Sequence, residues 1–137
     1  MNRICLLGLV LTMGLWGCAD QKEAPAASRS KVTRNVLLKN DLTGIAAKKG
    51  QLILVEVPPG EATGKHTHPV DEFVYILEGA GNLERAAAPS ATLKAGESMY
   101  LASGDVHEMK NASATVPLKF LQFSVTEEGQ PLAIPAH

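Results

Sequence analysis

The chain has 137 residues, of which 13 are Lys or Arg and 14 are Asp or Glu, so its formal net charge is −1. This balance, without a stripe of basic residues, gives no electrostatic support for nucleic-acid binding. The length is sufficient for one domain with a single hydrophobic core.

The first 17 residues predict an export signal. Arg3 gives a positive start, and the apolar stretch Ile4–Trp16 is shorter than the roughly 20 residues needed to span a bilayer. The stretch ends in Leu15-Trp16-Gly17-Cys18, which resembles the lipobox of bacterial lipoproteins. The resemblance implies cleavage before Cys18 and lipidation of that cysteine. The alternatives are an ordinary secretory signal peptide and a coincidental Gly-Cys pair.

Residues 18–35 are predicted to comprise the lipidated Cys18 and a flexible tether. The stretch Ala19–Lys31 mixes alanine, serine, charged residues and one proline, without apolar periodicity. Two or three acyl chains, at about 0.8 kcal/mol per buried methylene, hold a protein firmly at a membrane. We therefore expect an exported protein of the bacterial cell envelope, lipid-anchored and either facing the periplasm or located in the outer membrane.

The cysteines also restrict the chemistry of the domain. Cys5 leaves with the signal and Cys18 becomes lipidated, so no thiol remains in residues 36–137. No disulfide can form there, and nitrogen and oxygen atoms must supply any metal ligands.

Residues 36–137 are predicted to form one all-β domain. Short apolar runs alternate with turn residues, and no segment keeps the apolar period of about 3.6 residues that a helix needs. Pro58-Pro59-Gly60 ends one strand, because proline cannot donate to a sheet and glycine permits the turn. The expected strands are 36–38, 51–57, 72–77, 82–85, 92–93, 97–101, 106–110 and 116–125.

Nearly all of the chemistry falls in two blocks near the middle of the chain. The first is Gly-x5-His-x-His-x3-Glu-x6-Gly, and the second is Gly-x7-Gly-x2-His-x3-Asn. Three imidazoles and one carboxylate are a ligand set suited to a divalent transition metal. The residues of the two blocks are Gly60, His66, His68, Glu72 and Gly79, then Gly96, Gly104, His107 and Asn111.

The two blocks together resemble the double signature of the cupin family, over roughly residues 36–125. The resemblance implies a single-domain β-barrel of the jelly-roll type with one divalent transition metal in its mouth. It also implies that His66, His68, Glu72 and His107 are the metal ligands. One departure is Ala102, where the family usually has proline. Proline stiffens a turn there and binds no metal, so its loss costs at most about 1 kcal/mol.

The strand that begins at Glu72 has two apolar faces. Alternate side chains of a strand share a face, so Val74 and Ile76 are expected to follow Glu72 into the barrel. The opposite face carries Phe73, Tyr75 and Leu77. A strand that is apolar on both sides is usually covered on both sides. Either another sheet of the same chain or a second subunit is expected to cover the outer face. Because cupins are commonly dimers, we expect a homodimer.

The last long strand, 116–125, also has two distinct faces. Leu118, Phe120 and Gln122 share one face, while Leu121 and Phe123 lie on the other. The strand is predicted either to run past the metal inside the barrel or to form an edge of a sheet.

A site of three histidines and one glutamate in cupins typically leaves coordination positions open to water, as catalytic metal sites do. We therefore predict an enzyme that acts on a small molecule, of the oxygenase or of the isomerase or lyase type. The alternative is a non-catalytic module that binds a small ligand or a metal. Nitrogen and oxygen ligands do not choose sharply among Fe, Mn, Zn, Ni and Cu. Glu72 is also the candidate catalytic residue, since it could leave the metal and act as a base.

Overall fold

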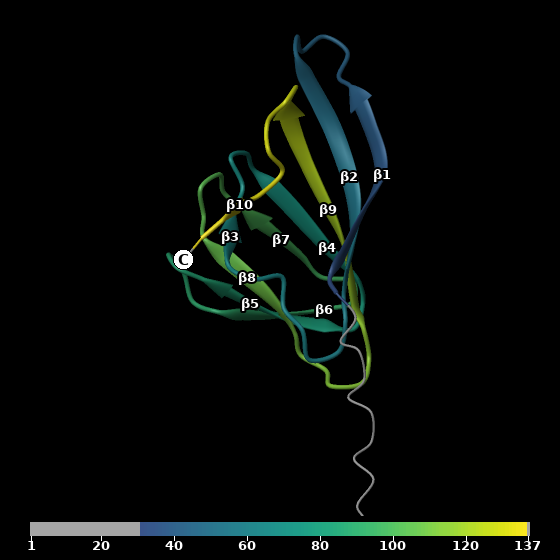
Figure 1. Cartoon of the computed structure of the whole chain (residues 1–137), viewed down its shortest axis with the longest axis vertical. Coiled ribbons are helices and arrows are strands. Elements are labelled where there is room, and N and C mark those ends of the chain that lie inside the picture. The colour runs from purple at the N-terminus through teal and green to yellow at the C-terminus, as the bar shows by residue number, and fades with distance from the viewer. Residues whose placement is uncertain (1–30, 137) are drawn as a thin grey trace, which may run out of the picture.

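Two five-stranded antiparallel sheets form the domain, and together they make an all-β barrel of the jelly-roll type (Figure 1). The computed structural model describes residues 31–136. The strand order is β1-β2-β9-β4-β7 in the first sheet and β10-β3-β8-β5-β6 in the second. The strands are β1 (Thr33–Asp41), β2 (Lys48–Val57), β3 (His66–Thr67), β4 (Glu72–Glu78), β5 (Ala80–Arg85), β6 (Ala91–Lys94), β7 (Ser98–Leu101), β8 (His107–Asn111), β9 (Leu118–Glu127) and β10 (Ile134–Pro135).

The predicted signal peptide and Cys18 lie outside the described residues, as does most of the predicted tether, so these stay predictions. The last residues expected in the tether, Thr33 to Asn35, belong to β1. Within residues 31–136 the structure has no helix that is long and apolar enough to cross a membrane.

Buried and exposed side chains alternate along the strands and build the core between the sheets. The predicted inward set of β4 is confirmed, since Glu72, Val74 and Ile76 are at most 3% exposed. The opposite face of the same strand is exposed, so no other sheet of residues 31–136 covers it. The core consists of Ile53, Val55, Val57, Val74, Ile76, Leu83, Leu93, Leu101, Met109, Leu118 and Phe120.

Strand β9 runs through the first sheet between β2 and β4. All ten residues of β2 pair with β9, from Lys48 opposite Glu127 to Val57 opposite Leu118. The strand therefore lies inside the sheet next to β4, which begins with the predicted ligand Glu72, and the alternative of a sheet edge is wrong. Gln122 points into the barrel and is 3% exposed.

The inner face of the first sheet is apolar at one end and polar at the other. Gln51 lies opposite Ser124, and Ser124 lies opposite Glu72 on its other side. Gln51 and Thr126 are also buried, and Nε2 of Gln51 donates to Oγ1 of Thr126 at 2.7 Å. Buried polar groups are usually hydrogen-bonded or serve a ligand. The polar end of the barrel therefore surrounds the predicted metal ligand Glu72.

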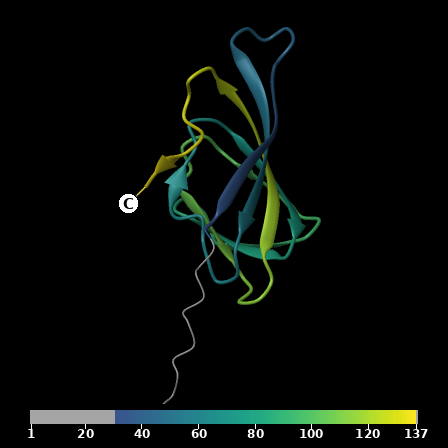
Figure 2. The ribbon, with the colours of Figure 1, turned by 45° about the vertical axis from the view of Figure 1, so that its right-hand side comes forward.

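The length of β1 and two short strands were not predicted. Strands β3 and β10 have two residues each and pair with one another, and two residues are too few to show alternation. Every residue of β1 is exposed, so its sequence shows no alternation of buried and exposed side chains from which its length could be predicted. Its length is set by its pairing with β2. Figures 1 and 2 show the β1–β2 hairpin projecting beyond the rest of the barrel.

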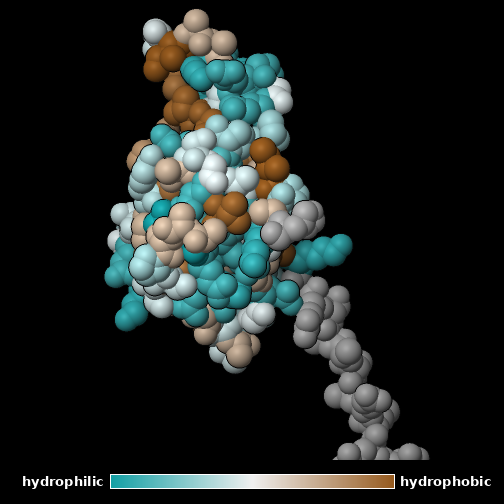
Figure 3. Space-filling model, turned by 90° about the vertical axis from the view of Figure 1, so that its left-hand side faces the viewer, coloured by the Kyte–Doolittle hydropathy of each residue, from teal (hydrophilic) through white to brown (hydrophobic). Residues whose placement is uncertain are grey.

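The outer face of the first sheet carries an exposed group of aromatic rings, which we call the aromatic face. Phe73 lies opposite Phe123 on one side and Tyr100 on the other. Its ring centroid is 5.4 Å from that of Tyr100 and 6.3 Å from that of Phe123. With Tyr75, these side chains are 41–51% exposed. A second exposed apolar group lies in the β1–β2 hairpin, near the top of the surface in Figure 3, where Ile45 is 53% exposed.

Candidate metal centre

Three histidines and one glutamate from both sheets meet inside the barrel. His66 begins β3 and His68 follows that strand directly, while Glu72 is the first residue of β4 and His107 the first of β8. Strand β3 pairs with β8 so that His66 lies opposite His107. The structure therefore brings together all four residues that the sequence predicts as metal ligands.

Each histidine ring is held through Nδ1 by a backbone carbonyl oxygen. A carbonyl only accepts hydrogen bonds, so Nδ1 carries the proton and Nε2 of the neutral ring keeps its lone pair. Histidines that bind metals are commonly oriented by such a bond from the other ring nitrogen. The acceptors are Gly64 for His66 at 2.8 Å, Leu132 for His68 at 2.5 Å and Asp105 for His107 at 2.9 Å.

The three rings surround a common point. Their centroids are 4.5 Å apart for His66 and His107, 4.9 Å for His66 and His68, and 5.3 Å for His68 and His107. One ligand atom from each ring lies within 4.8 Å of the others. Atoms bound to one ion at about 2.1 Å are at most about 4.2 Å apart, so a small closing movement is enough. The three histidines are thus positioned to hold a metal ion.

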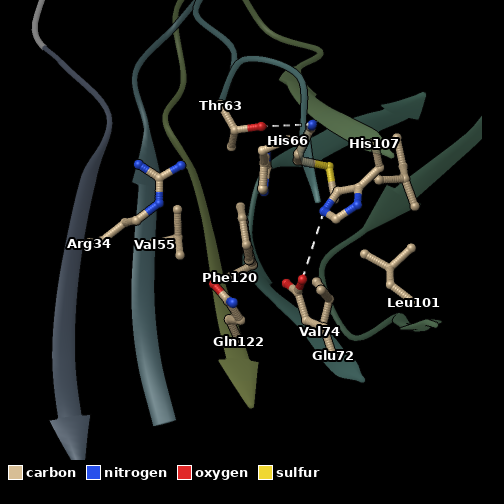
Figure 4. Close-up of a pocket in the computed structure, with 12 residues that line it drawn as sticks. Arg34, Val55, Thr63, His66, Glu72, Val74, Leu101, His107, Phe120 and Gln122 are labelled. Carbon is tan, nitrogen blue, oxygen red and sulfur yellow. Dashed lines mark hydrogen bonds and ion pairs between the residues drawn. The ribbon is translucent and has the colours of Figure 1, made fainter. Parts of the chain in front are cut away.

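Glu72 lies beside these rings and completes the set; Figure 4 shows it with His66 and His107. Its Oε2 is 2.7 Å from Nε2 of His68 and 3.7 Å from Nε2 of His107. Although both atoms are buried, neither Oε2 of Glu72 nor Nε2 of His68 makes a hydrogen bond of acceptable geometry. A buried polar atom left in this way costs about 1–3 kcal/mol. A cation shared by the two atoms would satisfy both, and the set of three nitrogens and one carboxylate fits a divalent transition metal.

The surroundings shift the pKa values of two histidines in opposite directions. Burial lowers the pKa of His66, and the neighbouring His107 and His68 act in the same direction. Burial also acts to lower the pKa of His68, but the close contact with the Glu72 carboxylate outweighs it, so this pKa is raised. The lowered pKa of His66 favours the neutral form that binds a metal, whereas the raised pKa of His68 makes a proton a stronger competitor for that ring.

Asp105 connects the His107 ring to the neighbouring strand β5. Its backbone oxygen holds Nδ1 of His107, and its side-chain Oδ2 accepts a hydrogen bond from Nε of Arg85 at 2.7 Å. Arg85 in turn lies opposite His107 in the pairing of β5 with β8. The ion pair thus fixes the segment that orients a predicted ligand, as outer partners of metal-binding histidines commonly do.

The other residues of the two blocks shape turns. All four block glycines have a left-handed backbone, with φ between 72° and 88°. Asn111 is buried, and its Nδ2 donates to the backbone oxygens of Val57 and Val116, both at 2.9 Å. Its Oδ1 accepts from the backbone nitrogen of Ser113 at 2.9 Å. Asn111 therefore fixes the loop that follows the His107 strand.

A small cavity adjoins His66, Glu72 and His107 (Figure 4). Its volume of about 20 Å³ has room for one or two water molecules. Two polar residues in its wall, Arg34 and Gln122, were not predicted as site residues. Arg34 precedes the first expected strand, and nothing in the sequence around it indicated that it would line the site. Gln122 could have been predicted as a site residue, because it is the one polar side chain among Leu118, Phe120 and Gln122 on the inward face of β9.

The fold and the site define a small β-barrel with a histidine cluster that could hold a metal ion. The family model of the cupin domain matches residues 53–125, more than half of the chain. The chain therefore belongs to the cupin family, as the two sequence blocks predicted.

One curated relative is the tetracenomycin polyketide synthase protein TcmJ of Streptomyces glaucescens, which is 28% identical over 89 residues. The match covers 64% of this chain and 57% of TcmJ, so the chain spans little more than half of that relative.

Several solved structures share the fold. A protein of Klebsiella pneumoniae with a double-stranded β-helix domain has a TM-score of 0.62 at 19% identity, over 83% of this chain and 90% of its own. A cupin-2 domain of Rhodospirillum rubrum has a TM-score of 0.61 at 23% identity, over 77% and 66%. The DMSP lyase DddQ of Ruegeria pomeroyi has a TM-score of 0.56 at 21% identity, over 64% and 43%. Identities this low establish a common fold and nothing further.

Proposed function

We propose that this protein binds one divalent transition metal through His66, His68, Glu72 and His107 and uses it to transform a small molecule. The observation that carries the proposal is the convergence of three Nε2 atoms, each freed by a backbone bond at Nδ1, beside a buried carboxylate. The cavity next to these ligands gives a small molecule a place to meet them.

The bound metal would supply the redox or Lewis-acid chemistry of an oxygenase, isomerase or lyase. The protein's own residues have separate tasks. The histidines hold the ion as neutral ligands, and Glu72 offsets one unit of its charge. Glu72 could also leave the metal and take a proton from a molecule in the cavity, since it forms part of the cavity wall.

A second candidate is a cupin module that binds a metal or a small ligand without transforming it. The small cavity favours this function, because about 20 Å³ leaves little room for a substrate. The two candidates differ in turnover. Full metal loading without conversion of any tested class of small molecule would support the binding module.

Elemental analysis of residues 22–137, purified without added metal and without an affinity histidine tag, tests the metal site. We expect about one Fe, Mn, Zn, Ni or Cu ion per chain, because four protein ligands of this kind retain such ions through purification. Absence of metal after purification, and again after reloading with each ion, would contradict the proposal.

We also propose that the domain works in the bacterial cell envelope, held by a lipid on Cys18. The support is the lipobox-like sequence of residues 15–18 alone. Replacing Cys18 by serine is expected to move the protein from the membrane fraction to the soluble fraction, because the acyl chains that anchor it are lost. Membrane association that survives in the Cys18→Ser variant would show that lipidation does not anchor the chain.

We propose further that two copies associate through the aromatic face. Side chains of this size that are about half exposed present roughly 400–500 Å² of mostly apolar surface in this cluster, a size that is often functional. This is about half of the roughly 800 Å² that each partner contributes to a standard interface. The aromatic face could therefore form the centre of a symmetric dimer interface.

Replacing Phe73 by lysine is expected to convert such a dimer into a monomer, because a two-fold interface would bring two like charges together in an apolar centre. Light scattering on the purified domain at micromolar concentration gives the mass. Ile45→Lys is the matched control, since Ile45 is equally exposed but lies outside the aromatic face. A wild-type protein with the mass of one chain would contradict the dimer.

A further inference from the structure

The cavity beside the histidines is lined by two hydrogen-bond donors that the proposed metal site does not use. Arg34 lies opposite Val55 in the pairing of β1 with β2, and Val55 is a core residue that is 1% exposed. Directly opposite residues share a face of a sheet, so Arg34 points toward the barrel interior. Figure 4 shows its guanidinium group at the cavity, on the side away from His107.

Gln122 contributes the second donor from β9. Its side chain is buried at 3% exposure, and its Nε2 atom has no hydrogen-bond partner among the residues that the structure describes. A third polar residue of the wall, Thr63, is already engaged. Its Oγ1 donates to the Gly64 oxygen at 3.2 Å and accepts from the Met109 nitrogen at 3.0 Å.

The buried amide nitrogen of Gln122 lacks an acceptor within residues 31–136, and the exposed Arg34 adds donors and a positive charge in the same cavity wall. With a divalent ion bound, the site would favour an anion. Arginine has five donors and no acceptor, and a buried amide nitrogen without a partner is costly. Three neutral histidines, one carboxylate, a divalent ion and Arg34 together give a net charge of about +2 at the cavity. A monoanion with two acceptor oxygens therefore fits both the hydrogen bonding and the charge.

We propose that Arg34 and Gln122 bind the carboxylate group of a small organic acid at the edge of the metal site. A carboxylate has two oxygens, and the cavity has room for one or two water molecules, so the group matches the available space. Arg34 pairs well with carboxylates because its planar fork donates two parallel hydrogen bonds. This inference rests on the proposed function, since it names the class of ligand that the same site takes.

Glycolate is a suitable probe because it is a small carboxylate, and glycolamide is its neutral counterpart. Isothermal titration calorimetry on the zinc-loaded protein is expected to show glycolate binding that Arg34→Gln weakens by about tenfold to a hundredfold. Gln122→Leu, which keeps the size of the side chain and removes its amide, is expected to weaken glycolate binding by about three- to tenfold. Glycolamide is expected to bind more weakly than glycolate and to be insensitive to Arg34→Gln.

Lys39→Gln is the matched control. It removes one positive charge from the same exposed strand β1, but Lys39 is not part of the cavity wall. Glycolate affinity is expected to be unchanged in this variant. An equal loss in Lys39→Gln and Arg34→Gln would reduce the effect to general electrostatics and overturn the inference, and so would unchanged affinity in Arg34→Gln.

Measuring the metal content of every sample separates this inference from the proposed function. If the protein is fully loaded with zinc but Arg34→Gln does not change the glycolate affinity, the carboxylate site is overturned and the metal site is still supported. Failure to load zinc, and then each of Fe, Mn, Ni and Cu, would overturn the metal site. Titration of that metal-free protein would still support the carboxylate site if Arg34→Gln weakened binding, and would overturn it if glycolate did not bind at millimolar concentration.

Discussion

Replacing His107 by alanine is expected to lower the affinity for zinc by at least about a hundredfold and to leave the purified protein nearly free of metal. Disrupting the outer partners of a metal-binding histidine already costs about ten- to a hundredfold in affinity, so removal of the ligand itself should cost at least as much. His107 is 5% exposed and lies opposite His66 in the pairing of β3 with β8, so the ligand removed is one that the fold holds inside the barrel. Competition against a chromophoric chelator gives the affinity, and elemental analysis gives the metal content.

The control for this change is Ala102→Pro. Ala102 is exposed and follows the end of β7, and the preceding Leu101 has the extended backbone that a following proline requires. Proline introduced there should keep the metal content of the wild type and change stability by at most about 1 kcal/mol. Equal metal content in the wild type and in His107→Ala would show that His107 is not a ligand.

Replacing Gly79 by alanine is expected to destabilise the domain by about 2–5 kcal/mol. The φ of Gly79 is 78°, a left-handed conformation that costs other residues about 1–2 kcal/mol. A Cβ atom at this position would also lie 2.7 Å from the backbone oxygen of Pro117, and such overpacking typically adds about 1–3 kcal/mol. Thermal unfolding followed by circular dichroism should show a midpoint lower by about 10–20 °C.

Gly104→Ala separates the two contributions to this loss. Gly104 has a similar φ of 80°, but a Cβ atom there would meet no atom within 4 Å. Only the backbone cost of about 1–2 kcal/mol should therefore appear. Equal destabilisation by the two substitutions would mean that the turn at Gly79 moves away from Pro117 without cost.

Gly79 and Gly104 are examples of the local signals from which much of the fold could be predicted. The block glycines mark turns with a left-handed backbone, and the strands between them show the alternation that places Glu72 inward and Phe73 outward. Both signals are local, because a turn depends on a few consecutive φ angles and an inward face depends on a period of two residues. Strand β3 escaped prediction because its two residues are too few to show any period.

The sequence by itself determined the ligand set of the candidate metal centre, because ligand chemistry and spacing belong to the residues: three imidazoles, one carboxylate and no thiol in residues 36–137. Only the tertiary structure decided what surrounds those ligands. The Leu132 carbonyl reaches His68 across 64 positions of the chain, and Arg34 reaches the cavity from an edge strand with no burial pattern. Such neighbours are set by the register of strands that are far apart in sequence, and a single sequence does not encode that register in any local pattern.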